Sequence, residues 1–251
     1  MADPTELTEL TVVTWNVQGR AGLDVGAAAD VLTGMGADLV GLQEVQRHQA
    51  VALTRRLGPR WRVVWAFKHW PVIAWPETVA ILSRYPLSGR RVLVLRPALP
   101  VRSRRRVAVV ADVAVADAPV RFASTHLSPA ATDGEWRRRE LARVGATRAD
   151  VVVGDLNVRD LDELGSVVGR AGWSDCWDPG QGTGCTHWGP GSRFGREPDH
   201  RLDYVLANRR FRPVECEVPT PDGRLASLSD HLPVRTVLRS AQRSSSVVTD
   251  E

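Results

Sequence analysis

The chain has 251 residues, of which 43% are hydrophobic and 25% are charged. This composition is typical of a globular protein and excludes a disordered or fibrous chain. No apolar run reaches the ~18 residues of a membrane span, and the acidic N-terminal segment lacks the basic and apolar regions of a signal peptide. We therefore expect a cytoplasmic protein without membrane insertion.

The basic residues give the chain a modest positive net charge of +4. A positive excess suits a phosphate-bearing partner. Lys68 is the only lysine, and two arginine runs occupy 104–106 and 137–139. Each run could be a solvated face or a phosphate-binding patch, and the solvated face is favoured. The three cysteines are odd in number and lack the Cys-x₂-Cys spacing of zinc sites, so we expect reduced thiols.

The predicted elements of the first half are mainly strands. Alternating β-branched residues predict a strand at 11–17, and apolar residues at helical spacing predict a helix at 24–32. A short buried strand at 39–42 precedes a helix at 46–57, which stops at the breaker Gly58-Pro59. The remaining strands of this half are predicted at 61–67, 78–82, 92–95, 107–115 and 120–124.

The second half alternates helices with buried strands. Helices are predicted at 133–144 and 161–170, around a strand at 151–153. Residues 178–200 are rich in Gly, Pro and charge and predict a long loop, after which strands follow at 202–206 and 233–238. The predicted organisation is a tail at 1–10, one domain at 11–239 and a disordered tail at 240–251.

Many strands with few helices predict a layered α/β fold. A doubly wound fold would need more helices and a glycine-rich phosphate loop, and neither is evident.

Six short strings place a carboxylate, an amide or an imidazole at the end of an apolar run. Such positions suit catalysis because a strand is rigid and the loop beyond it can vary. Alone, each string could be a helix cap or a turn. The strings are Thr14-Trp15-Asn16-Val17-Gln18, Leu42-Gln43-Glu44, Ser124-Thr125-His126-Leu127, Gly154-Asp155-Leu156-Asn157, Arg201-Leu202-Asp203-Tyr204 and Ser229-Asp230-His231.

In this order the strings resemble the endonuclease/exonuclease/phosphatase superfamily, the deoxyribonuclease I-like metal-dependent phosphoesterases. The resemblance runs from about Thr11 to about Val237 and includes Ile81-Leu82-Ser83-Arg84-Tyr85-Pro86. It implies a four-layer α/β sandwich, in which two packed mixed β-sheets are flanked by helices. It also implies that the strings converge on an active site at one end of the sandwich.

The same resemblance, with the chemistry of the side chains, assigns metal ligands and a base. Glu44 is the main candidate ligand for Mg²⁺, with Mn²⁺ as an alternative. Asn16 either supplies a neutral oxygen ligand or orients Glu44, and Asp230 could complete the site. His231 is the candidate base that takes a proton from water. Asp203 is expected to hold its imidazole in the correct tautomer.

Further residues are assigned to the scissile phosphate. Asp155 and Asn157 alternate, so on an extended segment both would point to one side, where they would position water and bind a phosphate oxygen. His126 would donate to the phosphate or protonate the leaving group, and Glu77 is placed as its partner. Gln46 stands where deoxyribonuclease I-like chains have an arginine that enters the DNA minor groove, a departure that argues against duplex DNA cleavage.

Four residues outside the main assignments are candidate substrate contacts. Trp70 and Trp75 are flanked by prolines and could stack on a base or sugar, although core packing is the alternative reading. Trp188 lies in the predicted long loop that should overhang the site. Arg84 could contact phosphate or serve a structural turn.

The expected function is Mg²⁺-dependent hydrolysis of a phosphodiester, by a nuclease or a phosphodiesterase. One alternative is a phosphomonoesterase acting on a small phosphorylated metabolite or an inositol phosphate. A second is a non-catalytic member that binds phosphate compounds or a protein. The retention of both histidines and all the carboxylates argues against this last reading. The expected partner is thus a phosphate ester, either nucleic acid or a small molecule, and we expect a monomer.

Overall fold

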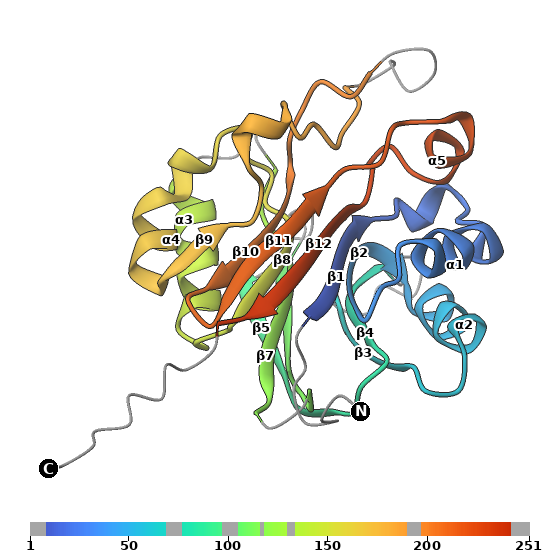
Figure 1. Cartoon of the computed structure of the whole chain (residues 1–251), viewed down its shortest axis with the longest axis horizontal. Helices are drawn as coiled ribbons and strands as arrows, with labels where there is room; N and C mark the ends of the chain where they lie inside the picture. Colours follow the sequence, from blue (N-terminus) through green and yellow to red (C-terminus); the bar gives the residue numbers. More distant parts are fainter. Residues whose placement is uncertain are drawn as a thin grey trace, which may run out of the picture.

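The computed structural model describes residues 9–68, 77–96, 105–115, 118–129, 134–189 and 197–241. Within them, two six-stranded mixed sheets pack face to face, with helices on their outer sides (Figure 1). The predicted four-layer α/β sandwich is confirmed. No helix among the described residues is long and apolar enough to cross a membrane.

The first sheet has the strand order β11-β12-β1-β2-β4-β3. Only β1 and β2 run parallel in it, and its other neighbours are antiparallel. Two helices, α1 and α2, pack against its outer face through Ala28, Leu32 and Leu53. The bounds are β1 Glu9–Asn16, β2 Leu39–Gln46, β3 Arg62–Phe67, β4 Glu77–Ser83, β11 Phe211–Glu217, β12 Val234–Ser240, α1 Val25–Gly34 and α2 Arg47–Leu57.

The second sheet has the strand order β5-β6-β7-β8-β10-β9. Here β7 and β8 run parallel, and the other pairs are antiparallel. Its outer face is covered by α3 and α4 through Leu141, Val144 and Val167. The bounds are β5 Leu87–Arg96, β6 Arg106–Val113, β7 Val120–His126, β8 Val151–Asp155, β9 Trp173–Asp175, β10 Asp203–Asn208, α3 Gly134–Gly145 and α4 Gly165–Ala171.

The remaining elements are short. A six-residue helix, α5 (Gly223–Leu228), precedes β12, and three 3₁₀ turns lie at Gly19–Ala21, Leu161–Leu164 and Pro179–Gln181. The predicted helix at 161–170 is thus a 3₁₀ turn followed by α4. Ser240 still belongs to β12, and residues 242–251 of the predicted tail lie outside the described residues.

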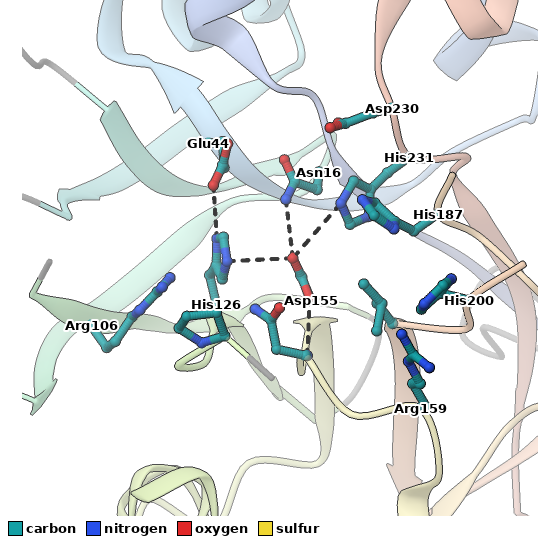
Figure 2. Close-up of a pocket in the computed structure, with 13 residues that line it drawn as sticks. Asn16, Glu44, Arg106, His126, Asp155, Arg159, His187, His200, Asp230 and His231 are labelled. Carbon is teal, nitrogen blue, oxygen red and sulfur yellow. Dashed lines mark hydrogen bonds and ion pairs between the residues drawn. The ribbon is translucent and has the colours of Figure 1, made fainter. Parts of the chain in front are cut away.

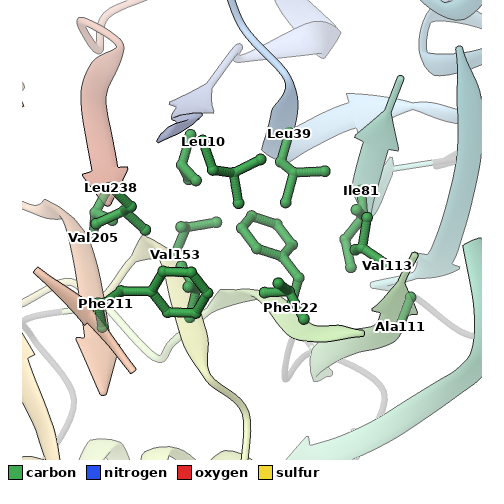
Figure 3. Packing of buried hydrophobic residues seen from close by; sticks show 14 of the residues in the cluster. Leu10, Leu39, Ile81, Ala111, Val113, Phe122, Val153, Val205, Phe211 and Leu238 are labelled. Atoms are coloured by element: carbon green, nitrogen blue, oxygen red, sulfur yellow. The ribbon is translucent and has the colours of Figure 1, made fainter. Parts of the chain in front are cut away.

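Both faces of the central strands are buried, which explains their nearly continuous apolar sequences. In β1, Leu10 and Val12 face the space between the sheets, whereas Val13 and Trp15 face the helices. Figure 3 shows the inner layer, where Phe122 packs among residues of both sheets. The two sheets therefore form one rigid support for the loops at their ends.

A close approach of the sheets occurs at Gly41 on β2. A Cβ there would lie 2.2 Å from a methyl of Val153 on the opposite sheet. Two residues further on, Gln43 Nε2 donates to Ser124 Oγ across the interface at 3.2 Å. Because a buried amide needs partners, this bond fixes the register of β2 against β7 directly below the ends of these strands.

Candidate active site

The six strings meet at one end of the two sheets, as expected from parallel β1 with β2 and parallel β7 with β8. Asn16, His126 and Asp155 are the last residues of β1, β7 and β8, and Asp203 is the first residue of antiparallel β10. All six strings contribute residues to the lining of a cavity of about 450 Å³ (Figure 2). Its lining is Asn16, Glu44, Arg106, His126, Pro129, Asp155, Asn157, Arg159, His187, His200, Leu202, Asp230 and His231.

Asp155 stands at the centre of this cavity. Its Oδ2 accepts a hydrogen bond from Asn16 Nδ2 at 3.1 Å and lies 3.4 Å from His126 Nε2 and 4.0 Å from His231 Nε2. Burial raises the pKa of this carboxyl to about 6, although the positive charge of His231 opposes the rise. Asp155 therefore links the two imidazoles electrostatically.

The residues around Asp155 fix its position. Gly154 has φ +150°, and a Cβ there would lie 2.0 Å from the Thr125 carbonyl oxygen, so no side chain fits. Asn157 adopts the left-handed conformation with φ +53° and is not on an extended segment. Its backbone N–H donates to Asp155 Oδ1 at 3.0 Å and its Nδ2 donates to the Leu127 carbonyl. A turn, rather than strand alternation, brings both side chains to the cavity.

His231 is held from behind by a carboxylate. Its Nδ1 lies 2.7 Å from Asp203 Oδ2, and both side chains are buried. Burial alone would lower the pKa of His231, but the charge and hydrogen bond of Asp203, with Asp155 and Asp230, outweigh it and raise the pKa to about 10. The imidazole therefore turns Nε2 toward the cavity and binds a proton strongly.

This arrangement is supported by neighbouring side chains. The Thr186 hydroxyl donates to the same Asp203 oxygen at 2.7 Å. Trp15 Nε1 donates to the His231 carbonyl at 2.9 Å. The Ser229 hydroxyl donates to the Asn16 carbonyl and accepts from the His231 N–H. The loop that carries His231 is thus tied to β1.

The second imidazole, His126, has a different partner. Its Nδ1 lies 3.2 Å from the ammonium of Lys68, a residue that the sequence motifs do not include. The same ammonium donates to Glu77 Oε1 at 2.6 Å and to Glu44 Oε1 at 2.9 Å. Glu77 therefore reaches His126 through Lys68, which modifies the predicted pairing of these two residues.

The predicted metal ligands supply hard oxygen atoms along one edge of the cavity, where Figure 2 shows Asn16 between Glu44 and Asp230. Glu44 has φ +55° at a register shift in β2, which turns its carboxylate out of the strand pattern. Its Oε1 contacts Lys68 and His126, which leaves Oε2 without a protein partner among the described residues. Asp230 accepts from Gln18 Nε2 through Oδ2.

These donors fit a divalent cation of the Mg²⁺ type. Two carboxylates and one amide oxygen, which also accepts from the Gln18 N–H at 3.2 Å, form the kind of set that Mg²⁺ uses when water completes the octahedron. Within the described part of the chain, no group of three His, Cys, Asp or Glu side chains is arranged to hold a metal ion. A cation here would therefore depend on Asn16 and on water as well as on the carboxylates.

Four residues that line the cavity were not assigned to the site from the sequence. Two are arginines, which Figure 2 shows on opposite sides of Asp155: Arg159, and Arg106 from the run for which a solvated face was favoured, although its side chain is buried. Two are histidines, His187 and His200, from the predicted long loop. The His187 ring lies 4.5 Å from that of His231, and burial together with the His231 charge lowers its pKa to about 4. His187 is therefore an uncharged side chain that lines the cavity beside the predicted base.

The predicted substrate contacts have mixed outcomes. Trp70 and Trp75 lie outside the described residues. Trp188 is wrong as a substrate contact, because its side chain is 2% exposed and packs with Leu225, Ala226 and Leu232. A large apolar side chain in an adjoining loop gains more from burial than from exposure to the cavity.

Arg84 is also wrong as a phosphate contact. It follows Ser83, the last residue of β4, whereas the cavity lies at the end where β4 begins with Glu77. Its Nη1 is 2.8 Å from Asp38 Oδ1, just before β2. Arg84 thus has the structural turn role that the sequence left open.

The family assignment agrees with this geometry. The model of the endonuclease/exonuclease/phosphatase family matches residues 13–231. The chain therefore belongs to this family, whose members hydrolyse phosphate esters. No curated protein matches the chain.

Solved structures with the same fold extend the comparison. An endonuclease/exonuclease/phosphatase from Beutenbergia cavernae is 25% identical, with a TM-score of 0.73 over 93% of this chain and 72% of that one. A mannosyl-6-phosphatase from Bacteroides thetaiotaomicron is 16% identical, with a TM-score of 0.72 over 91% and 99%. TDP2 from D. rerio, complexed with a single-strand DNA product, is 20% identical, with a TM-score of 0.70 over 92% and 99%. The last two share the fold.

Proposed function

We propose that the chain is a Mg²⁺-dependent hydrolase that cleaves a phosphodiester by attack of water. The observation that carries this proposal is the convergence of the His231–Asp203 pair, Asp155 and three hard oxygen ligands on one cavity. Hydrolysis of a phosphate ester needs charge neutralisation, a positioned nucleophile and a stabilised leaving group. Each requirement has a candidate in this set.

The chain's own residues perform the proton transfer. Water is positioned by Asp155 and Asn157, and His231 Nε2 accepts its proton while Asp203 holds Nδ1. When bound at Glu44, Asn16 and Asp230, Mg²⁺ or Mn²⁺ would neutralise phosphate oxygens and favour deprotonation of His231. His126 Nε2 faces the same centre and binds a phosphate oxygen.

The lining of the cavity supports a diester. Arg106 lies on one side of Asp155 and Arg159 and His200 lie on the other, so side chains are available to contact an ester group on each side of a phosphate. Nucleic acid and small diesters both have this form. A DNA-bound enzyme and a sugar phosphatase share the fold, so the fold itself does not choose between the ester classes.

The test is hydrolysis of bis-p-nitrophenyl phosphate beside p-nitrophenyl phosphate, with Mg²⁺ or Mn²⁺ and with EDTA. We expect turnover of the diester that EDTA removes. The blank is His231→Ala, and the matched control is His48→Ala, an exposed histidine on α2. We expect no turnover from the blank and full turnover from the control.

Each other outcome has a definite meaning. Turnover of the monoester alone would replace the diester with a small phosphorylated metabolite. Turnover retained by His231→Ala would remove the proposed base. Absence of turnover with both esters and with a panel of nucleotides and sugar phosphates would favour a member that binds phosphate compounds without catalysis.

A further inference from the structure

The most unusual group outside the predicted machinery is the side chain of Lys68. It is the only lysine of the chain, and it is completely buried. Its position is set by the backbone, because its N–H donates to the Glu77 carbonyl at 2.9 Å and so extends the pairing of β3 with β4. A buried lysine is rare unless it is paired, so its partners show its role.

The three partners use all three N–H groups of the ammonium. They are Glu77 Oε1 at 2.6 Å, Glu44 Oε1 at 2.9 Å and His126 Nδ1 at 3.2 Å. Both carboxylates accept from the ammonium, which can donate but cannot accept. His126 Nδ1 must therefore be the acceptor in this contact.

The position of the His126 proton follows from this direction. In a neutral imidazole one nitrogen is protonated and the other is not. With Nδ1 accepting from Lys68, the proton lies on Nε2, which points to the cavity and lies 3.4 Å from Asp155 Oδ2. His126 thus presents a donor to the place where a phosphate oxygen would bind.

Lys68 also orients the predicted metal ligand. By holding Glu44 Oε1 it leaves Oε2 toward the cavity. The same three contacts tie β2, β4 and β7 together at the edge of the site. A change at Lys68 would therefore reach both a candidate ligand and an imidazole.

We propose that Lys68 is a positioning residue that fixes His126 as the Nε2–H tautomer and aims Glu44 at the cavity. His126 then serves as a hydrogen-bond donor to a phosphate oxygen, and it is not the acid that protonates the leaving group. The assignment of His126 and Glu44 to the reaction rests on the proposed function. The tautomer itself can be measured without turnover.

The test compares three proteins by long-range ¹⁵N–¹H correlation of ¹⁵N-histidine samples, with the His126 signals assigned from a His126→Gln spectrum. They are the wild type, Glu77→Gln and the double variant Lys68→Met/Glu77→Gln. The double variant is used because Lys68→Met alone would remove the ammonium that lies 2.6 Å from the buried carboxylate of Glu77. Glu77→Gln is the matched control, since it keeps Lys68 beside His126.

We expect Nδ1 without a proton and Nε2 with one in the wild type and in Glu77→Gln. In the double variant Nδ1 loses its donor, and Glu44 Oε1 at 3.7 Å becomes an available acceptor. The proton should therefore move to Nδ1. An Nδ1–H in the wild type, or a change of tautomer in Glu77→Gln alone, would overturn the proposal.

A kinetic measurement on the same proteins provides the second readout. The double variant should lose kcat by roughly 10²-fold at nearly unchanged KM, the effect of losing one preorganised donor to the phosphate, whereas Glu77→Gln, which keeps the ammonium beside His126, should lose less. Equal kcat in all three would overturn the proposed role. An inactive wild type that keeps the Nε2–H tautomer would defeat the proposed function and not the assignment of Lys68.

Discussion

The two imidazoles of the site differ in what lies behind them. His231 and His126 both turn Nε2 to Asp155 Oδ2, at 4.0 Å and 3.4 Å. Behind His231 is the carboxylate of Asp203, whereas behind His126 is the ammonium of Lys68. A carboxylate favours the gain of a second proton, but an ammonium opposes it. The same side chain can therefore act as a base on one side of the site and as a fixed donor on the other.

Replacing the carboxylate on each side by an amide should have unequal effects. Asp203→Asn should lower kcat by roughly 10³-fold or more, because an amide does not stabilise the imidazolium or hold the required tautomer. Glu77→Gln should have a much smaller effect, because Lys68 stands between Glu77 and His126. Steady-state kinetics of both variants provide the measurement, with Asp30→Asn at an exposed position as control. Equal losses would break the comparison.

Glu44→Gln tests the ligand that lies on the Lys68 side. The amide keeps an oxygen but loses the charge, so the Mg²⁺ concentration for half-maximal rate should rise by roughly tenfold to a hundredfold. The control is Glu215→Gln on β11, which is exposed and remote from the cavity. Mn²⁺ binding followed by calorimetry gives the same comparison without turnover. An unchanged metal titration would exclude Glu44 as a ligand.

The raised pKa of His231 should also make the folding stability depend on pH. The pKa of this group is raised from 6.5 to about 10, so its contribution to stability is complete below about pH 6.5 and is lost as pH rises through 10. We expect the free energy of unfolding, measured with urea in EDTA, to fall between pH 6.5 and 10 by a few kcal/mol.

The control for this pH dependence is His231→Asn, which does not titrate and should show a flatter profile over the same range. A wild-type profile that is equally flat, or a variant that falls equally, would show that the Asp203 contact does not hold a proton on His231.

The smallest effect on the kinetics is expected for a change at Arg159, at the exposed edge of the cavity. Arg159 is exposed, lines the cavity and has no ion pair with another described residue. Arg159→Ala should raise KM for a diester by roughly fivefold, as expected for one screened surface charge, and should weaken the salt dependence of kcat/KM. Arg170→Ala, at an exposed position on α4, is the control. Unchanged KM and salt dependence would remove Arg159 from the substrate path.

The strand-end residues could be predicted because they are encoded locally, whereas the four-layer sandwich was predicted from the family resemblance. Asn16, His126 and Asp155 follow apolar strands directly, so their placement requires only correct strand ends. The edge strand β11 was missed because it is mostly exposed and contains Pro213, features that edge strands tolerate. The short elements β9 and α5 offered too few residues for a periodic pattern.

The role of Lys68 could not be predicted from the local sequence, for a different reason. No motif surrounds it, and its partners on β2, β4 and β7 come together only through sheet packing. The predictions for Trp188 and Arg84 were wrong for the opposite reason, because both residues lie near motifs in the sequence. Packing directs Trp188 into a core cluster, and the direction of β4 places Arg84 at the end of the sheet away from the cavity. Proximity in sequence does not determine the direction of a side chain.

The burial of the only lysine has a practical consequence for chemical labelling. The described surface offers no exposed lysine to amine-selective reagents, because Lys68 is buried and the chain has no other lysine. Cross-linking or immobilisation through lysine would therefore fail on the folded protein. Acylation of Lys68 would instead require local opening of the site. Its rate would therefore measure how often the structure around Lys68 opens.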